Sequence, residues 1–273
     1  MKLAAGLLLK NRFVLEELIG SGRLCDVYKA LDLRRQEAQP PQPYVAIKIL
    51  MDEYRDKINA HAFVALAYES FRTSVINHPN VASIFDFDKM GDIAFLTMEL
   101  MEGQTLATLL EQNSVDKALE LAVGICRGLN CVHHHGVLHL NIRPDTIFVT
   151  AEGIAKLIGF GNTREIGSTS DMDTMIKALG PPTHAYASPE MLANEDPSPA
   201  DDVFSLAVVI YELFSGSHPY GGALASEALD KGIEPERVSG LNDQQWDVLA
   251  SALRLSREDR LQTVKELAAS FKS

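Results

Sequence analysis

Hydrophobic residues in the first hundred positions of the chain come in short runs that end at turn-forming residues. Four of these runs are expected to form strands: residues 13–19, 44–50, 81–87 and 93–99. Gly91-Asp92 separates the last two, which predicts a hairpin. A helix is expected over about residues 57–77, closed by His78-Pro79-Asn80. This part of the chain is therefore predicted to be a small antiparallel sheet with one main helix.

After Leu106 the apolar residues recur at three- and four-residue steps, which is typical of helices that bury one face. Two strands joined by a Glu152-Gly153 turn interrupt this pattern. The expected helices are about Val115 to His134, Ala225–Lys231, Asp243–Leu253 and Val264–Phe271. Together the two parts predict an α+β protein with a β-rich beginning and a mostly helical remainder.

The composition is that of an ordinary globular protein, with 46% hydrophobic and 23% charged residues. The formal net charge of −12 disfavours a nucleic-acid or anionic-membrane surface. Three cysteines without metal-ligand spacing indicate a reduced, cytoplasmic chain. The apolar run at residues 3–9 is followed at once by Lys10 and Arg12, so we interpret it as the approach to the first strand rather than a signal peptide. No run reaches the ~20 apolar residues of a membrane span.

Candidate chemistry is concentrated in residues 139–161, which begin His-Leu-Asn-Ile-Arg-Pro-Asp-Thr and end Gly-Phe-Gly. This stretch resembles the catalytic loop H-R-D-L-K-P-E-N and the metal-binding D-F-G of protein kinases. Asn141 stands at the position of the catalytic Asp, Thr146 at that of the metal-binding Asn, and Gly159 at that of the metal-binding Asp. The resemblance therefore implies a phosphoryl-transfer site in which no catalytic group is intact and no metal ligand remains.

Other stretches resemble the nucleotide-binding parts of the same family, in the same order. Gly20-Ser21-Gly22 resembles the Gly-rich loop, with Cys25 at the third Gly, and Val45-Ala46-Ile47-Lys48 resembles the strand whose Lys pairs with a helix Glu. Residues 98–103 resemble the hinge that meets adenine, and Phe148 is expected either to stack on the base or to fill the pocket. The nucleotide-binding residues implied by the resemblance are Gly20, Gly22, Val27, Ala46, Lys48, Glu69, Met98, Glu99, Met101 and Phe148.

The residues that hold the kinase fold together are retained. The resemblance implies this structural role for His139, Phe160, Glu190, Asp202 and Arg260. Leu140 replaces the Arg that pairs with a phosphorylated activation segment in many kinases, so switching by that route is not expected. His133-His134-His135 invites a metal interpretation, but consecutive helical residues point about 100° apart and no further ligands follow at useful spacing.

The resemblance extends from Gly20 to Arg260, and bacterial eukaryotic-like (Hanks-type) serine/threonine kinases show the greatest likeness. It implies one two-lobed domain over residues 1–273, with an N-lobe of about 1–101 and a C-lobe of about 102–273. The lost groups favour a pseudokinase: a regulatory signalling module that binds a protein partner such as another kinase, a phosphatase or an effector, and that requires no cofactor. Two alternatives stay open. One is a sensor that binds ATP without Mg²⁺, and the other is a weak kinase or nucleotidyl transferase using Asp145, Glu152, Asp171 or Asp173 as metal ligands.

Overall fold

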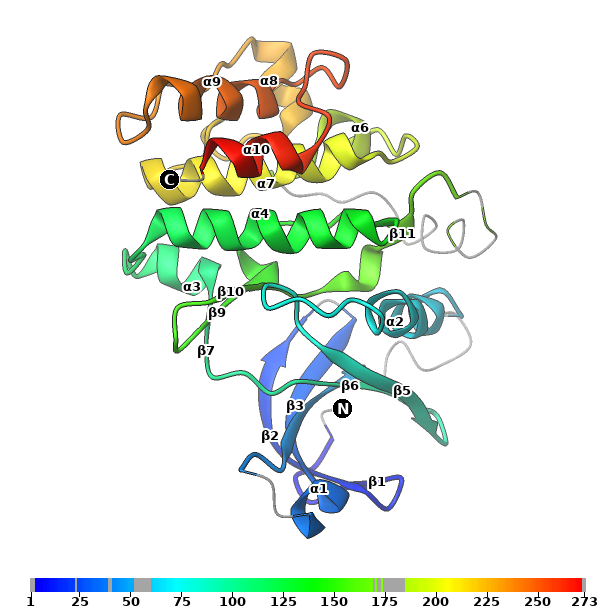
Figure 1. Cartoon of the computed structure of the whole chain (residues 1–273). Coiled ribbons are helices and arrows are strands. Elements are labelled where there is room, and N and C mark those ends of the chain that lie inside the picture. Colours follow the sequence, from blue (N-terminus) through cyan, green and yellow to red (C-terminus); the bar gives the residue numbers. More distant parts are fainter. Residues whose placement is uncertain are drawn as a thin grey trace. The chain divides into compact units, whose positions relative to one another are not determined.

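The computed structural model describes residues 3–22, 24–38, 41–51, 60–168, 170, 173 and 185–271, without the side chains of Ala60 and His61. The backbone divides into two compact units (Figure 1). Unit 1 comprises Met1–Asn77 and Ala82–Glu102, and unit 2 comprises His78–Val81 and Gly103–Ser273. In the described part of the chain, none of the helices has both the length and the apolar character of a membrane-crossing segment.

Unit 1 is built on an antiparallel sheet whose strands follow the order β1-β2-β3-β4-β6-β5. The strands are β1 (Leu8–Leu9), β2 (Phe13–Ser21), β3 (Cys25–Asp32), β4 (Tyr44–Leu50), β5 (Ile84–Met90) and β6 (Ile93–Met98). The four predicted strands are confirmed as β2, β4, β5 and β6, and β1 and β3 are additional. β5 begins at Ile84 rather than at residue 81, because Val81 instead forms an isolated parallel bridge with Leu157.

Alternation along the strands divides the core of unit 1 between the two faces of the sheet. Val45, Ile47 and Ile49 of β4 pack on one face with Phe95, while Leu50 belongs to a second cluster with Leu96. Helix α2 (Ala60–Thr73) covers this second face through residues that include Ala62 and Leu66. The same alternation places Lys48 on the face that α2 covers.

The predicted end of the helix in unit 1 is also wrong, and one short helix was not predicted. Helix α2 ends at Thr73, four residues earlier than expected, because the chain turns there and buries Ile76. The expected start of this helix lies outside the described residues. A short helix that was not predicted, α1 (Leu33–Glu37), follows β3 and begins where the buried Asp32 accepts a hydrogen bond from the Arg34 N–H.

Unit 2 is mostly helical. Its helices are α3 (Leu106–Glu111), α4 (Ala118–His134), α6 (Pro189–Leu192), α7 (Pro199–Ser215), α8 (Ala225–Lys231), α9 (Asp243–Ala252) and α10 (Val264–Ser270). Its strands are β7 (Gly103–Thr105), β8 (Val137–Leu138), β9 (Ile147–Thr150), β10 (Ala155–Leu157) and β11 (Arg164–Glu165). Helix α4 begins three residues later than predicted, because Lys117 adopts a left-handed conformation immediately before it.

Helices α4 and α7 are the centre of unit 2 (Figure 1). One face of α4 packs on α7 and α10, and the other contacts β10. Helix α7 is buried along nearly its whole length, and the side chain of Asp201 accepts a hydrogen bond from the Ser198 N–H at its beginning. These two buried helices position the loop over residues 139–146.

Asn80 packs against helix α4 at two glycines and links the helix to β10 through hydrogen bonds. Its side chain donates a 2.8 Å hydrogen bond to the Ala155 carbonyl, and its own carbonyl accepts one of 2.9 Å from the Leu157 N–H. A Cβ at Gly128 would lie 2.5 Å from the Asn80 carbonyl oxygen, and one at Gly124 would lie 2.8 Å from Asn80 Nδ2. This close approach requires glycine on α4.

Gly128→Ala is therefore expected to destabilise the protein by about 1–3 kcal/mol, because overpacking outweighs the better helix propensity of Ala. Urea denaturation measures the change in the free energy of unfolding. Gly240→Ala is the matched control, since a Cβ at Gly240 would meet no atom within 4 Å. Equal stability of Gly128→Ala and the control would contradict the close approach.

Candidate functional site

Lys48 on β4 and Glu69 on α2 form an ion pair inside unit 1. Lys48 Nζ lies 2.6 Å and 2.8 Å from the two carboxylate oxygens of Glu69. Burial alone would lower the pKa of Lys48, but the charge and hydrogen bonds of Glu69 outweigh it and raise that pKa. The lysine is therefore held charged, in a fixed position on the α2 face of the sheet.

The β2–β3 turn carries the two glycines of the predicted Gly-rich loop. Neither Gly20 nor Gly22 has a positive φ, and a Cβ at either would meet only ordinary contacts, so the fold of this turn does not itself require glycine. The Gly22 N–H donates a 2.8 Å hydrogen bond to the Cys25 carbonyl. The Cys25 side chain points inward and packs with Leu50, and burial raises the pKa of its thiol to about 11. The side chain at the position of the third Gly therefore does not project from the turn.

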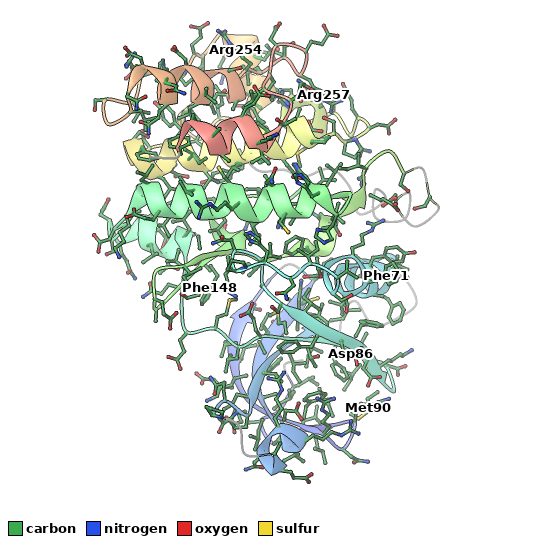
Figure 2. The ribbon with its side chains drawn as sticks, viewed as in Figure 1. Phe71, Asp86, Met90, Phe148, Arg254 and Arg257 are labelled. Carbon is green, nitrogen blue, oxygen red and sulfur yellow. The ribbon has the colours of Figure 1, made fainter. Side chains whose placement is uncertain are left out.

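The other residues predicted to surround a nucleotide in unit 1 lie on β3, β4 and β6. Val27 pairs with Lys48 in the sheet, and Ala46 pairs with Met98. Glu99 follows β6, and its carboxylate accepts a 2.7 Å hydrogen bond from the Ser83 N–H. Met101 is half-buried after the end of β6. Phe148, the last residue of the predicted set, is half-buried on β9 of unit 2 (Figure 2).

The loop after β8 is anchored by the carboxylate of Asp202, which is completely buried near the beginning of α7. Its two oxygens accept hydrogen bonds from the backbone N–H groups of His139 (2.8 Å) and Leu140 (2.7 Å). His133 Nε2 on α4 lies 2.9 Å from the same carboxylate. Burial alone would raise the pKa of Asp202, but these donors outweigh it and lower that pKa. Asp202 therefore joins α4, α7 and the loop.

The loop itself is closed by further hydrogen bonds from its own residues. His139 Nδ1 accepts from the Asn141 N–H at 3.2 Å, and its Nε2 lies 3.1 Å from the Ile158 carbonyl, to which it donates. The His139 ring packs against the buried ring of Phe160, with centroids 4.5 Å apart. These contacts fix the loop relative to the turn that carries Gly159.

Asn141, Thr146 and Gly159, the three positions that depart from the kinase pattern, lie together. A Cβ at Gly159 would be 3.0 Å from Thr146 Cγ2 and 3.8 Å from Asn141 Nδ2. The Thr146 hydroxyl donates to the Asn141 carbonyl at 2.6 Å and accepts from the Arg143 N–H at 3.1 Å. This hydroxyl therefore serves as a local cap that holds the loop.

The side chains present here do not fit a divalent ion such as Mg²⁺, which prefers carboxylate and other oxygen ligands in an octahedral set. Gly159 offers no ligand, and Thr146 offers a neutral hydroxyl already engaged in the loop. Asp145 pairs instead with Arg143 at 3.0 Å. Within the described residues, no three His, Cys, Asp or Glu side chains gather as a metal site would require. Asp171, one of the acids suggested from the sequence, lies outside those residues.

A second buried charge network holds the chain at the beginning of α6. Arg260 donates to both carboxylate oxygens of Glu190, at 2.9 Å and 3.1 Å. The Arg257 N–H donates to Glu190 as well, and the Arg257 guanidinium lies 3.0 Å from Asp201. Burial alone would raise the pKa of Glu190, but Arg260 and the other donors lower it. The network joins α6 and α7 to the loop before α10.

His218 is expected to make the protein less stable below neutral pH. Its Nδ1 accepts from the N–H groups of Tyr220 and Gly222, and its Nε2 donates to the Ala185 carbonyl. Burial lowers the pKa of His218, and the pKa of His78 is lowered too. A histidine pKa lowered by folding adds stability above its unfolded value of about 6.5, and this stability is lost as the pH falls toward the folded value.

The free energy of unfolding should therefore fall between about pH 6.5 and pH 5, above the range in which most carboxylates titrate. His218→Asn is expected to flatten part of this slope, and His78 accounts for another part. Urea denaturation over this pH range measures both slopes. The same slope in the wild-type protein and the variant would contradict the contribution of His218.

The sequence interpretation missed two contacts that organise the site. His133 was considered only as a metal ligand, whereas it pairs with Asp202, 69 residues away. The anchoring of Asn80 across α4 was also missed, although Gly124 and Gly128 four residues apart on one helix were a signal for close approach. No local pattern could have paired His133 with Asp202.

Comparisons with known proteins agree with this geometry. The family model of the protein kinase domain matches residues 13–271. A probable serine/threonine-protein kinase of Clostridium perfringens is 27% identical over 271 residues, which are 96% of this chain and 38% of that protein. The serine/threonine-protein kinase PknA of Mycobacterium tuberculosis is 31% identical over 225 residues, which are 80% of this chain and 50% of that protein. The chain thus spans half or less of the length of these relatives.

Solved structures show the same fold. The structure titled PpkA-294 apo form aligns with a TM-score of 0.77 at 22% identity, covering 99% of both chains. The kinase domain of Mycobacterium tuberculosis PknI, in a cysteine-to-alanine mutant form, aligns with a TM-score of 0.70 at 19% identity and covers 99% of this chain and 98% of that one. The fold is the α+β fold of protein kinases, and the chain belongs to the protein kinase domain family.

Proposed function

We propose that this domain is a pseudokinase, a regulatory module of signalling that acts by binding a protein partner rather than by transferring phosphate. The observation that carries the proposal is the chemistry at Asn141, Thr146 and Gly159. Kinase catalysis depends on positioning and on neutralising phosphate charge with metal ions. Here one metal-binding position has no side chain, and the hydroxyl at the other caps the loop.

The size of the expected loss supports this proposal. Asn141 can donate and accept hydrogen bonds but is not a useful general base, and losing a general base costs roughly 10²–10⁴ in rate. Loss of the metal anchor removes several kcal/mol more of transition-state stabilisation, and each ~1.4 kcal/mol lowers the rate tenfold. A typical kinase turnover of ~1–100 s⁻¹ would therefore fall to a negligible rate. The retained Asp202 and Glu190 networks keep the fold that a partner would recognise.

Incubation with γ-labelled and α-labelled ATP tests the proposal. We expect no covalent label on the domain or on a generic protein substrate, with the kinase domain of PknA as the positive control. The matched variant is Lys48→Ala, which removes the predicted phosphate-pairing lysine. Label on protein that disappears in Lys48→Ala would overturn the proposal and identify a kinase or nucleotidyl transferase.

The second candidate function is a sensor that binds ATP without a metal ion. It is favoured by the assembled Lys48–Glu69 pair and by glycines at residues 20 and 22 that the turn itself does not require. A sensor of this kind would change its affinity for a protein partner when ATP binds. Measuring the affinity for a protein partner with and without ATP distinguishes such a sensor from a module whose partner binding does not depend on nucleotide.

A further inference from the structure

Strand β5 forms one edge of the sheet in unit 1. The strand order places β5 last, with β6 as its only neighbour among the strands that the structure describes. Asp86 and Lys89 are exposed along it. The edge of a sheet presents a row of unpaired backbone N–H and C=O groups, which is a template for pairing with the strand of another chain.

Alternate residues of β5 direct their backbone N–H groups away from β6. Met90 pairs with Ile93 across the two-residue turn Gly91-Asp92, a position at which the two strands exchange hydrogen bonds. Because this pattern alternates along an antiparallel pair, Lys89 and Phe87 face outward. Their N–H groups are the donors that a further strand would need.

An aspartate side chain engages each of these outward donors. The Phe87 N–H donates a 2.8 Å hydrogen bond to Oδ1 of Asp86, and the Lys89 N–H donates one of 2.7 Å to Oδ1 of Asp88. Each aspartate is the residue immediately before the donor, so its short side chain bonds to its own stretch of backbone. Figure 2 shows Asp86 on β5, toward the middle of the strand. The two carboxylates also place negative charge on the edge.

Neighbouring features of unit 1 support these caps at both ends of β5. Lys10 Nζ lies 3.1 Å from Oδ1 of Asp88, and the Lys10 N–H donates to the Met90 sulfur at 3.3 Å. The turn between β1 and β2 therefore rests on the end of β5. At the beginning of the strand, a register shift between Ile84 and Asp86 interrupts the ladder. Charged side chains and bulges are the means by which sheet edges are protected from pairing.

We infer that Asp86 and Asp88 keep β5 from pairing with the β5 of a second copy of this chain. A strand that pairs antiparallel with its own copy makes a two-fold contact in which both free edges are satisfied at once. In that contact the outward N–H groups of Phe87 and Lys89 would meet carbonyls of the other copy. With the caps in place these donors are already engaged, and the carboxylates of the two copies would repel one another. The chain is therefore closed to self-association at this edge.

Sedimentation equilibrium of the full chain over a range of concentrations tests this inference. Asp86→Ala/Asp88→Ala removes both caps, and its average mass should rise with concentration toward that of a dimer of the wild-type species. Asp86→Asn/Asp88→Asn removes the same charges but keeps an acceptor oxygen at each position, so its mass should match that of the wild-type protein. Asp92→Ala, in the exposed turn of the same hairpin, is the matched control and should match it as well.

A proline on the same strand locates the contact. Lys89→Pro, added to Asp86→Ala/Asp88→Ala, deletes an outward N–H that the ladder with β6 does not use, and it should abolish the association. If that protein does not fold, hydrogen exchange takes its place: the β5 peptide of Asp86→Ala/Asp88→Ala should exchange more slowly at high concentration than at low.

A wild-type mass of Asp86→Ala/Asp88→Ala at every concentration would overturn the inference. Equal association of the alanine and asparagine variants would overturn it too, because charge alone would then protect the edge. So would an association that Lys89→Pro does not reduce, or one that leaves the exchange of the β5 peptide unchanged.

Discussion

Replacing Asp202 by Ala is expected to lower the free energy of unfolding by about 3–5 kcal/mol, the largest effect of any single substitution considered for this protein. The carboxylate is completely buried and accepts from the backbone N–H groups of His139 and Leu140 and from His133. Without it, two buried N–H groups lose their partners, at about 1–3 kcal/mol each. The total free energy of unfolding of a typical domain is only about 5–15 kcal/mol.

Urea denaturation followed by circular dichroism measures this loss. Asp202→Asn keeps one acceptor oxygen, so its stability should lie between those of Asp202→Ala and the wild-type protein. Asp243→Ala is the matched control, because the Asp243 side chain is 89% exposed and should contribute less than about 1 kcal/mol. An Asp202→Ala protein as stable as this control would show that the loop over residues 139–141 is not held by α7.

Arg260→Ala is expected to have the second largest effect, also about 3–5 kcal/mol. The guanidinium is buried and pairs with Glu190, and its remaining donors reach the carbonyls of Arg254, Leu255 and Ala200. Removing it leaves Glu190 with a buried charge and only the Arg257 N–H among these donors. Arg260→Lys should recover little, because one ammonium cannot donate to Glu190 and to all three of these carbonyls at once.

The control for this substitution is Arg254→Ala, at an exposed arginine in the same loop (Figure 2). Arg254→Ala should change the free energy of unfolding by no more than about 0.5 kcal/mol. Thermal denaturation of the wild-type protein and the three variants at one pH gives the comparison. If Arg254→Ala and Arg260→Ala lowered the melting temperature equally, the buried network at α6 would not be the support described above.

Local patterns in the sequence predicted most of the secondary structure, because alternation and helical spacing report directly on which face is buried. β4 illustrates this, since Val45, Ile47 and Ile49 alternate with residues of the other face. The residues at which helices begin and end were less predictable. Helix α2 ends early where Thr73 donates its hydroxyl to the Glu69 carbonyl, and α4 begins late after the left-handed Lys117.

The candidate site was predictable where a stretch resembles a kinase motif, as at Lys48 and Glu69, whose ion pair is present in unit 1. Contacts that depend on long-range packing were not predictable. The sequence identified Thr146 as a poor metal ligand, but only the structure shows that its hydroxyl caps the loop at Asn141 and Arg143. The left-handed backbone at Leu140 likewise follows from Asp202 rather than from its own neighbours in sequence.

The side chains beside Thr146 and Gly159 offer no anchor for a divalent ion in this kinase fold. The most direct measurement is the thermal stability of the domain with millimolar ATP, in the presence and absence of Mg²⁺. We expect Mg²⁺ to make no difference: the melting temperature either stays unchanged or rises equally in both conditions. A ligand at 100 times its Kd stabilises a protein by ~2.7 kcal/mol, a shift that is easily detected. A rise with ATP that requires Mg²⁺ would show that the domain does hold a divalent ion beside the nucleotide.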